Sequence, residues 1–244
     1  MSGNGQGIIV ITGASTGIGR ACALDLDRRG YRVFAGVRRQ QDGDDLRAEA
    51  SSRLTPIMLD VTDRAQIAQA ADQVREQAAG RGIHGLINNA GIVVPGPLEI
   101  MPLDLFEQQL QVNVVGLVAV SQAFLPALRT ARGRIVNISS DNGRTTWPYL
   151  GAYCASKHAI EALSDSLRME LLPWRIPVIV VEPGSIVTPI WEKSTALGQK
   201  LRENLTARGQ ELYGEAFQRL EKSYPRSPAP ASRPRRSRMW SPVP

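Results

Sequence analysis

Short apolar runs alternate with longer amphipathic stretches along most of the chain. The short runs are rich in Val and Ile, have the length of buried strands, and lie at 7–12, 32–37, 54–59, 85–88, 134–139 and 178–182. Residues at helical spacing fill the stretches between them, at about 19–29, 42–53, 63–79, 103–130 and 153–172, with a weaker pattern at 194–224. This alternation predicts an α/β fold: a single doubly wound, Rossmann-like parallel sheet with helices on both faces.

Individual residues predict where the helices begin, bend and end. Thr62 has the residue type of an N-cap for the third predicted helix. Pro126 predicts a kink or break near the end of the fourth helix, and Pro189 predicts an irregular segment before the last helical pattern. Gly209 and Gly214 predict breaks within that last pattern.

Composition sets the number of domains and separates the carboxyl end from the rest. The chain has 244 residues, enough for one large α/β domain with a stable core. Five arginines in residues 226–244 supply most of the net charge of +6, so residues 1–225 are nearly neutral. Six of the 16 prolines also lie beyond position 224, without periodicity. We therefore predict one folded domain at 1–225 and a basic, disordered tail at 226–244.

Cysteine, histidine and apolar content indicate the compartment. Cys22 and Cys154 give no disulfide framework, and with His84 and His158 they form no metal-binding spacing. We therefore expect a reducing compartment and no metal site. The polar N-terminal sequence and the shortness of the apolar runs predict neither a signal peptide nor a membrane span. These features indicate a soluble, cytoplasmic protein.

A glycine-rich turn follows the first predicted strand. Gly13, Gly17 and Gly19 lie between that strand and an amphipathic helix, in the spacing G-x-x-x-G-x-G. Glycines let the backbone approach a pyrophosphate closely, and a helix N-terminus supplies N–H groups and a positive dipole end. The turn therefore predicts a nucleotide site, although three glycines can also serve only a tight connection.

The end of the second predicted strand bears on the type of nucleotide. NAD-binding folds usually carry an acid there, but Arg38 and Arg39 occupy this point and the first acid, Asp42, comes later. An arginine suits the 2′-phosphate of NADP, so NADP is favoured over NAD. The alternative is that both arginines merely face solvent.

Polar residues also end the third and fourth predicted strands. Asp60 follows the third strand, on the side where ligands bind in such sheets, or else it caps a loop. The sequence Asn88-Asn89-Ala90-Gly91 ends the fourth strand. Its amides can face a ligand or form an Asx-type turn.

A tyrosine and a lysine lie one helical turn apart in the fifth predicted helix. The spacing of Tyr153 and Lys157 places both side chains on one face. A nearby cation favours the phenolate, which would lower the pKa of the tyrosine and make it a general acid or base near neutral pH. The same spacing also arises in helices with no catalytic role.

Taken together, these motifs resemble the short-chain dehydrogenase/reductase (SDR) family over residues 7 to about 190. The residues that carry the resemblance are Thr12 to Gly19, Asn88 to Gly91, Asn113 in the fourth helix, Ser140 thirteen positions before Tyr153, and Pro183-Gly184 with Thr188. Each motif is weak alone, but five in this order and spacing are specific. The wording of residues 139–168 is most similar to the subgroup that contains retinol and hydroxysteroid dehydrogenases.

The resemblance implies a mechanism. Tyr153 would exchange a proton with the substrate oxygen during hydride transfer, and Lys157 would lower its pKa and bind the nicotinamide ribose. Ser140 would hydrogen-bond the substrate oxygen, and Asn113 would hold a water that links Lys157 to solvent. The implied cofactor contacts are Gly13, Ser15, Gly17, Ile18, Gly19, Arg38, Asp60, Val61, Asn89, Ala90, Gly91, Tyr153, Lys157, Pro183, Gly184, Ile186 and Thr188.

The implied function is an NADP-preferring oxidoreductase, with NAD possible as cofactor. It would interconvert an alcohol and its carbonyl on an apolar small molecule that resembles a steroid, retinoid or lipid. A substrate flap at about 185–225 supports an apolar substrate, because it carries Ile186, Ile190, Trp191 and Leu197. Relatives in the family suggest a homodimer or homotetramer built on the two long helices.

Three other interpretations are weighed against this one. A sugar-nucleotide epimerase also uses Tyr-x-x-x-Lys, but it usually has a larger carboxyl-terminal domain than fits here. A non-catalytic or impaired cofactor-binding relative fits the unusual carboxyl end, where the family normally adds one more strand, although the complete Asn-Ser-Tyr-Lys set argues against decay. The arginine-rich tail has no aromatic ladder beyond Trp240, so we expect no nucleic-acid partner.

Overall fold

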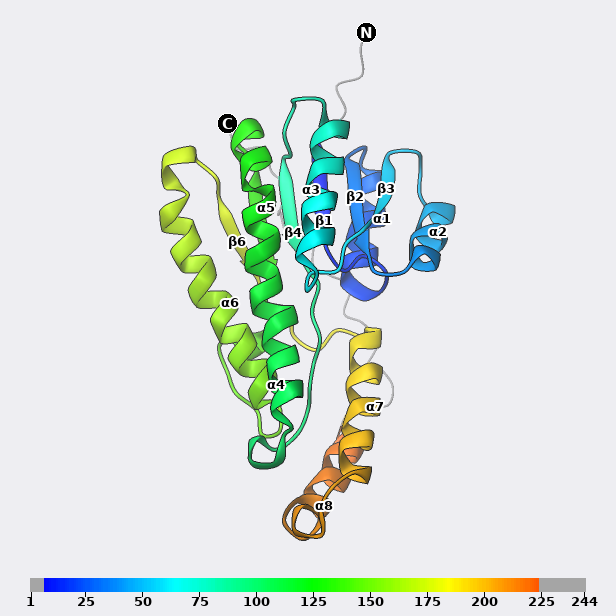
Figure 1. Cartoon of the computed structure of the whole chain (residues 1–244), viewed down its shortest axis with the longest axis vertical. Helices are drawn as coiled ribbons and strands as arrows, with labels where there is room; N and C mark the ends of the chain where they lie inside the picture. The colour runs from blue at the N-terminus through cyan, green and yellow to red at the C-terminus, as the bar shows by residue number, and fades with distance from the viewer. Residues whose placement is uncertain (1–6, 224–244) are drawn as a thin grey trace.

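The computed structural model describes residues 7–223 and contains a six-stranded parallel sheet in the order β3-β2-β1-β4-β5-β6. The chain builds outward from β1 to β3, returns to the middle, and builds outward again from β4 to β6 (Figure 1). The predicted doubly wound sheet is therefore confirmed. The strands are β1 (Ile8–Ile11), β2 (Arg32–Val37), β3 (Leu54–Met58), β4 (Gly85–Asn88), β5 (Arg134–Ile138) and β6 (Val178–Val181).

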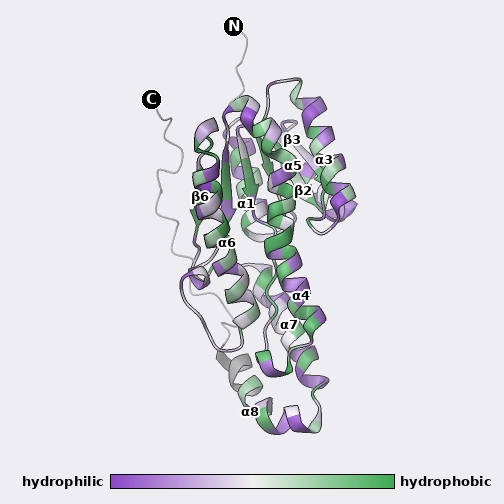
Figure 2. Cartoon of the chain, turned by 60° about the vertical axis from the view of Figure 1, so that its left-hand side comes forward, coloured by the Kyte–Doolittle hydropathy of each residue, from purple (hydrophilic) through white to green (hydrophobic). Residues whose placement is uncertain are grey.

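Helices cover both faces of the sheet. The main helices are α1 (Gly17–Arg28), α2 (Gln40–Glu49), α3 (Arg64–Ala78), α4 (Leu103–Leu110), α5 (Gly116–Ala131), α6 (Gly151–Glu170), α7 (Pro189–Glu203) and α8 (Ala207–Ser223). Short helical turns lie at η1 (Leu98–Ile100), η2 (Gln111–Val115), η3 (Asp141–Gly143) and η4 (Leu172–Trp174). Figure 2 shows hydrophobic strands inside and helices of mixed polarity around them.

Alternation along β1 shows why both faces are buried. Ile8 and Val10 belong to the core cluster under α3, α5 and α6, whereas Ile9 and Ile11 belong to the cluster under α1 and α2. Successive strand residues point to opposite faces, so a strand buried on both sides must be apolar throughout. All four residues are at most 2% exposed.

The predicted N-cap of the third helix is wrong by one residue. Asp63, not Thr62, is the N-cap of α3: its Oδ1 accepts hydrogen bonds from the backbone of Ala65 and Gln66 at 2.9 and 3.1 Å. Thr62 instead donates its hydroxyl to Asp60 at 2.7 Å. Both residue types can cap, and the Asp60 carboxylate draws the Thr62 side chain away.

The predicted long helix spans three segments, α4, η2 and α5, and η2 is a turn of π-helix that contains Asn113. The helix continues through Pro126 to Ala131, so the predicted break near its end is absent. By length and composition this stretch could cross a membrane. Val120, Phe124 and Leu128 of α5 are buried in the core cluster against the sheet.

The flap forms two helices beyond the carboxyl ends of the strands (Figure 1). Pro189 is the first residue of α7 rather than part of an irregular segment, because proline suits the first helical turn. The break lies between Glu203 and Ala207, and Gly209 and Gly214 both lie inside α8. The predicted tail at 226–244 falls outside the described residues.

Candidate active site

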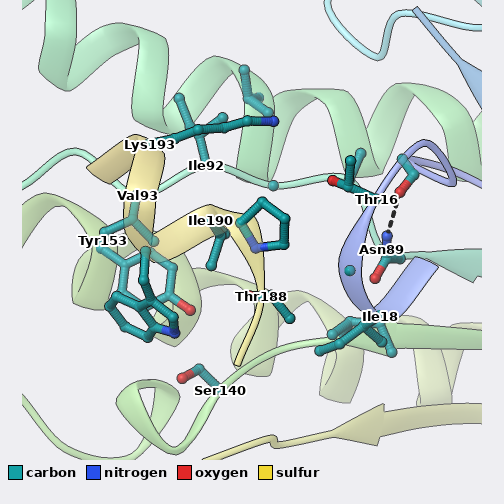
Figure 3. A pocket seen from close by; sticks show the side chains of 18 of the residues that line it. Thr16, Ile18, Asn89, Ile92, Val93, Ser140, Tyr153, Thr188, Ile190 and Lys193 are labelled. Carbon is teal, nitrogen blue, oxygen red and sulfur yellow. Dashed lines mark hydrogen bonds between the residues drawn. The ribbon is translucent and has the colours of Figure 1, made fainter. Parts of the chain in front are cut away.

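A cavity of about 1330 Å³ opens at the carboxyl ends of the strands, at the point between the paired strands β1 and β4 where the strand order changes direction. In doubly wound sheets this switch point is where ligands bind. The cavity is lined by the glycine-rich loop, the ends of β2 to β5, the start of α6 and the start of α7 (Figure 3). Its volume exceeds that of a typical site for one small molecule, so it can hold a dinucleotide and a substrate together.

The glycine-rich loop packs too closely for side chains. A Cβ added to Gly13, which has a φ of +65°, would lie 2.8 Å from the Cα of Ala90. A Cβ on Gly19 would lie 2.3 Å from the carbonyl oxygen of Gly13. The Asn89 amide fixes this packing, because its Nδ2 donates to the carbonyl oxygens of Thr12 and Gly13, both at 3.0 Å. Glycine is required here to form a backbone cradle.

The cradle suits a phosphate group. The helix α1 begins in it, and the side chain of its N-cap, Thr16, makes no capping hydrogen bond. The first backbone N–H groups of α1 therefore remain available beside the cavity, at the positive end of the helix dipole. Ser15, Thr16, Gly17 and Ile18 line the cavity at this point. The described residues thus fit the pyrophosphate of a dinucleotide.

The ends of β2 and β3 form the far end of the cavity. Arg38, Asp60 and Val61 line it. Arg39 faces away and pairs with Asp42 through two hydrogen bonds at 2.6 and 3.0 Å. Arg38 forms no ion pair within residues 7–223, so of the two predicted arginines only Arg38 is placed to meet a ligand. Asp60 both lines the cavity and caps the loop at Thr62.

Tyr153, Lys157 and Ser140 meet at the opposite end of the cavity. Each side chain is only 6% exposed, and the Lys157 ammonium lies 5.6 Å from the centre of the Tyr153 ring. Lys157 Nζ also donates to the Ile138 carbonyl at the end of β5, at 2.8 Å. Ser140 follows the same strand and faces Tyr153 across the pocket (Figure 3). The structure therefore brings the three predicted groups together.

The pKa of Tyr153 does not follow the prediction made from helix spacing. Burial raises it above the ordinary value; the neighbouring Ser140 hydroxyl opposes this shift in part, and the Asp141 charge adds to it. Burial also lowers the pKa of Lys157 from 10.5 to about 8, partly offset by Glu161. In the protein alone, desolvation therefore outweighs the cation effect expected of Lys157.

Asn113 does not line the cavity, and its side chain is 1% exposed. Its Oδ1 accepts from the Ile92 backbone N–H at 2.9 Å, and its Nδ2 donates to the Ile92 carbonyl at 3.1 Å and to Ser156 Oγ at 3.0 Å. The side chain thus fastens the loop at Ile92 to α6. The expected role of Asn113 in holding a water that links Lys157 to solvent stays a prediction.

Most of the predicted cofactor contacts line one cavity. Gly19 is the exception, because it lies beneath the cradle, where it packs against the Gly13 carbonyl and the Asn89 amide. The predicted residues that line the cavity are Gly13, Ser15, Gly17, Ile18, Arg38, Asp60, Val61, Asn89, Ala90, Gly91, Tyr153, Lys157, Pro183, Gly184, Ile186 and Thr188. They come from six separate segments, and their assignment as contacts stays a prediction.

The apolar wall beside Tyr153 was largely missed in the sequence. Val93 and Leu150 are buried with Tyr153 in one cluster, and Ile190 and Trp191 of α7 pack against it. Val93 and Leu150 lie in loops, where no periodic pattern marks a buried residue. Only Ile190 and Trp191 carried a signal, as large apolar side chains of the predicted flap.

The sequence profile described as short chain dehydrogenase matches residues 7–197. The chain belongs to this family. Family membership confirms the predicted family and the enzyme class, an oxidoreductase acting on alcohol or carbonyl groups.

Two relatives lie in the predicted subgroup. Retinol dehydrogenase 7 of Rattus norvegicus is 42% identical over 212 residues, which are 86% of this chain and 67% of the relative. The 17-beta-hydroxysteroid dehydrogenase type 6 of Bos taurus is 39% identical over 213 residues, with the same shares. The chain thus spans about two thirds of the length of these relatives.

Solved structures agree with the fold. A short chain dehydrogenase from Burkholderia cenocepacia in complex with NADP has a TM-score of 0.69 and 30% identity, covering 88% of this chain and 96% of its own. A short-chain dehydrogenase from Streptomyces avermitilis has a TM-score of 0.70 and 35% identity, covering 74% and 67%.

Proposed function

We propose that this protein is an NADP-preferring oxidoreductase that interconverts an alcohol and its carbonyl on an apolar small molecule. The observation that carries the proposal is the single cavity with a phosphate cradle at one end and Ser140, Tyr153 and Lys157 at the other. The cradle would hold the pyrophosphate, and the nicotinamide would then extend toward Tyr153. The reduced cofactor would supply the hydride and the oxidised cofactor would accept it, while the side chains would donate or accept the proton on the substrate oxygen.

The raised pKa of Tyr153 favours a protonated phenol at neutral pH, which suits a proton donor to a carbonyl oxygen. Ser140 Oγ donates to Asp141 Oδ1 at 2.9 Å and accepts from the Asn142 backbone N–H at 3.2 Å. In the reaction Ser140 would turn its hydroxyl from Asp141 to the substrate oxygen. With a pKa of about 8, Lys157 stays mostly charged at neutral pH and would stabilise a phenolate left by proton transfer.

The preference for NADP rests on the end of β2. Arg38 lines the cavity without an ion pair in the described part of the chain, and it stands directly after β2, where NAD-binding folds usually carry an acid. A guanidinium can bind a phosphate in bidentate fashion. The Burkholderia cenocepacia relative in complex with NADP supports the same choice.

The apolar wall supports the substrate class. Val93, Leu150 and Trp191 surround Tyr153, so a hydrophobic ketone or aldehyde would gain free energy by burial there. The two named relatives, a retinol dehydrogenase and a 17-beta-hydroxysteroid dehydrogenase, suggest retinoids and steroids as the first compounds to try.

The test is a matched substrate panel with NADPH and NADH. Retinaldehyde, a 17-ketosteroid and a small polar ketone are each followed by the loss of reduced-cofactor absorbance. We expect turnover of at least one apolar compound, a lower KM than for the polar ketone, and a higher kcat/KM with NADPH. Cofactor binding without turnover of any compound would contradict the proposed activity. It would favour the alternative of a cofactor-binding family member with impaired catalysis. Faster turnover of the polar ketone would overturn the substrate class alone.

A further inference from the structure

Two cations approach the adenosine end of the cavity from different elements. Arg38 follows β2, and Lys193 lies on the flap helix α7; both are exposed and both line the cavity. Neither forms an ion pair with a carboxylate within 4.0 Å in the described part of the chain, whereas the neighbouring Arg39 is paired with Asp42. Cations that line a cavity without such a partner are available to an anionic ligand.

Both cations act on the same carboxylate. Arg39 lowers the pKa of Asp42 most, through its hydrogen bonds, and the charges of Lys193 and Arg38 lower it further, in that order. The charge of Lys193 therefore acts at the start of α2, just after the end of β2. In Figure 3 its side chain lies well apart from Ser140, on the other side of the pocket.

The start of the flap sits against the glycine-rich loop, which explains how Lys193 reaches this place. A Cβ on Gly17 would be 3.3 Å from the Cβ of Thr188 and 3.9 Å from the Cδ of Pro189. Lys193 follows Pro189 by about one helical turn, roughly 6 Å along the axis. The lysine is thus held near the cradle by the same contact that positions α7.

The carboxylates near these two cations leave both of them free to pair with a dianion. Arg39 compensates Asp42, and Asp60, which lines the same end of the cavity, accepts hydrogen bonds from the backbone N–H and the hydroxyl of Thr62. Glu192 on α7 also lines the cavity, but it forms no ion pair with Arg38 or Lys193. A phosphate monoester carries a charge of about −1.5 to −2 near neutral pH and would pair with both cations.

We infer that Lys193 is a further cofactor-specificity residue, which binds the 2′-phosphate of NADP together with Arg38 and so draws the flap onto the cofactor. The inference rests on the proposed function, because it requires that the cavity takes NADP. It adds a contact from the flap to the contacts expected from the strand ends. NADP, but not NAD, would then favour the position of α7 over the cavity.

The test measures binding, not turnover. Fluorescence titrations give the Kd of NADPH and of NADH for the wild type, Lys193→Ala, Lys193→Arg and Lys200→Ala. Lys200 is the matched control: it lies on the same helix seven residues later, about 10 Å along the axis on the same face, and does not line the cavity. Adenosine 2′,5′-bisphosphate, displaced against NADPH, reports on the phosphate without the nicotinamide. Thermal melting of each variant confirms folding.

We expect Lys193→Ala to weaken NADPH and the bisphosphate by about 10-fold, the size of one charge-assisted hydrogen bond, and NADH by less than about 2-fold. Lys193→Arg should retain most of the affinity, and Lys200→Ala should match the wild type. NADPH, but not NADH, should slow proteolysis of the flap in the wild type.

If Lys193→Ala bound NADPH as tightly as the wild type and kept the preference for NADPH over NADH, the inference would be overturned and the proposed function would stand. Equal weakening of NADPH and NADH would overturn it too, by placing the lysine at the shared pyrophosphate. A wild type that binds neither cofactor would overturn the proposed function and this inference together.

Discussion

The two ends of the cavity are built in different ways. At the cofactor end, backbone meets backbone: Gly13 packs on Ala90, and Asn89 bonds the loop to β1. At the substrate end, side chains form the walls, and two of them come from the flap helix α7. Ile186 and Val187 at the start of the flap are 45% and 55% exposed. A phosphate site needs fixed donors, whereas an apolar site needs only enclosure, which a movable segment can supply.

The largest expected effect lies at the substrate end. Tyr153→Phe removes the proton donor and keeps the ring that packs in the apolar cluster. We expect kcat to fall by about 10³-fold, within the usual range for loss of a general acid, while the Kd for NADPH changes less than about 3-fold. Stopped-flow kinetics and cofactor titration of the same preparation check both values. A variant that retains more than a tenth of wild-type kcat would exclude Tyr153 as the donor.

Substitution of a glycine at the cofactor end of the cavity should abolish cofactor binding, whereas substitution of a glycine in the flap should not. An alanine at Gly19 would place its Cβ 2.3 Å from the Gly13 carbonyl, so the cradle must shift. We expect loss of measurable NADPH binding and a decrease of about 1–3 kcal/mol in the free energy of unfolding. The measurements are cofactor titration and urea denaturation.

Gly209→Ala is the matched control in the flap. A Cβ there would lie 3.3 Å from the flexible Leu205 side chain and 3.4 Å from Thr206 Oγ1, with no backbone atom among its three nearest neighbours, and alanine suits α8. We expect normal NADPH binding and unchanged or slightly increased stability. If both substitutions weakened NADPH binding and lowered the free energy of unfolding equally, the cofactor end would not be more rigidly packed than the flap.

Trp191→Ala should weaken the substrate end alone. Trp191 packs beside Val93 and Leu150, so its removal shortens the apolar wall. We expect KM for an apolar ketone to rise about 10-fold, in line with the loss of one aromatic contact, with little change in the Kd for NADPH. Steady-state kinetics on apolar and polar ketones check this. A uniform rise in KM for both would mean that Trp191 supports the flap rather than contacts substrate.

The smallest expected effect is a dependence of stability on pH. Lys157 has a pKa of about 8 in the folded chain, below its unfolded value of 10.5, so the unfolded chain binds more protons between these values. The free energy of unfolding of the wild type should therefore rise with pH in this window, relative to Lys157→Met, by about 1–2 kcal/mol between pH 7 and 9.5. Parallel urea titrations of both proteins measure it, and a constant difference would contradict the shift.

The sequence predicted most of the fold because its signals are local. The apolar runs at β1 and β4 and the glycines at 13, 17 and 19 act through backbone geometry, which periodicity and residue type report directly. The meeting of Ser140, Tyr153 and Lys157 followed from motif order, since the ends of parallel strands share one edge.

What the sequence could not provide depends on tertiary contacts. The side-chain bonds of Asn113 depend on a π-helical turn and on the loop at Ile92. The raised pKa of Tyr153 depends on burial, which the spacing to Lys157 does not reveal. Lys193 reads as an ordinary exposed lysine until α7 is placed over the glycine-rich loop.

The most direct test of hydride transfer at this site is to follow a deuterium atom from the cofactor to the product. Purified protein is incubated with retinaldehyde and with NADPH that carries two deuterium atoms at nicotinamide C4. The mass of the alcohol product is measured by mass spectrometry. We predict retinol with one deuterium from the wild type and none above background from Tyr153→Phe. Unlabelled alcohol, or no alcohol from this or any other apolar carbonyl while NADPH is bound, would contradict hydride transfer at this site.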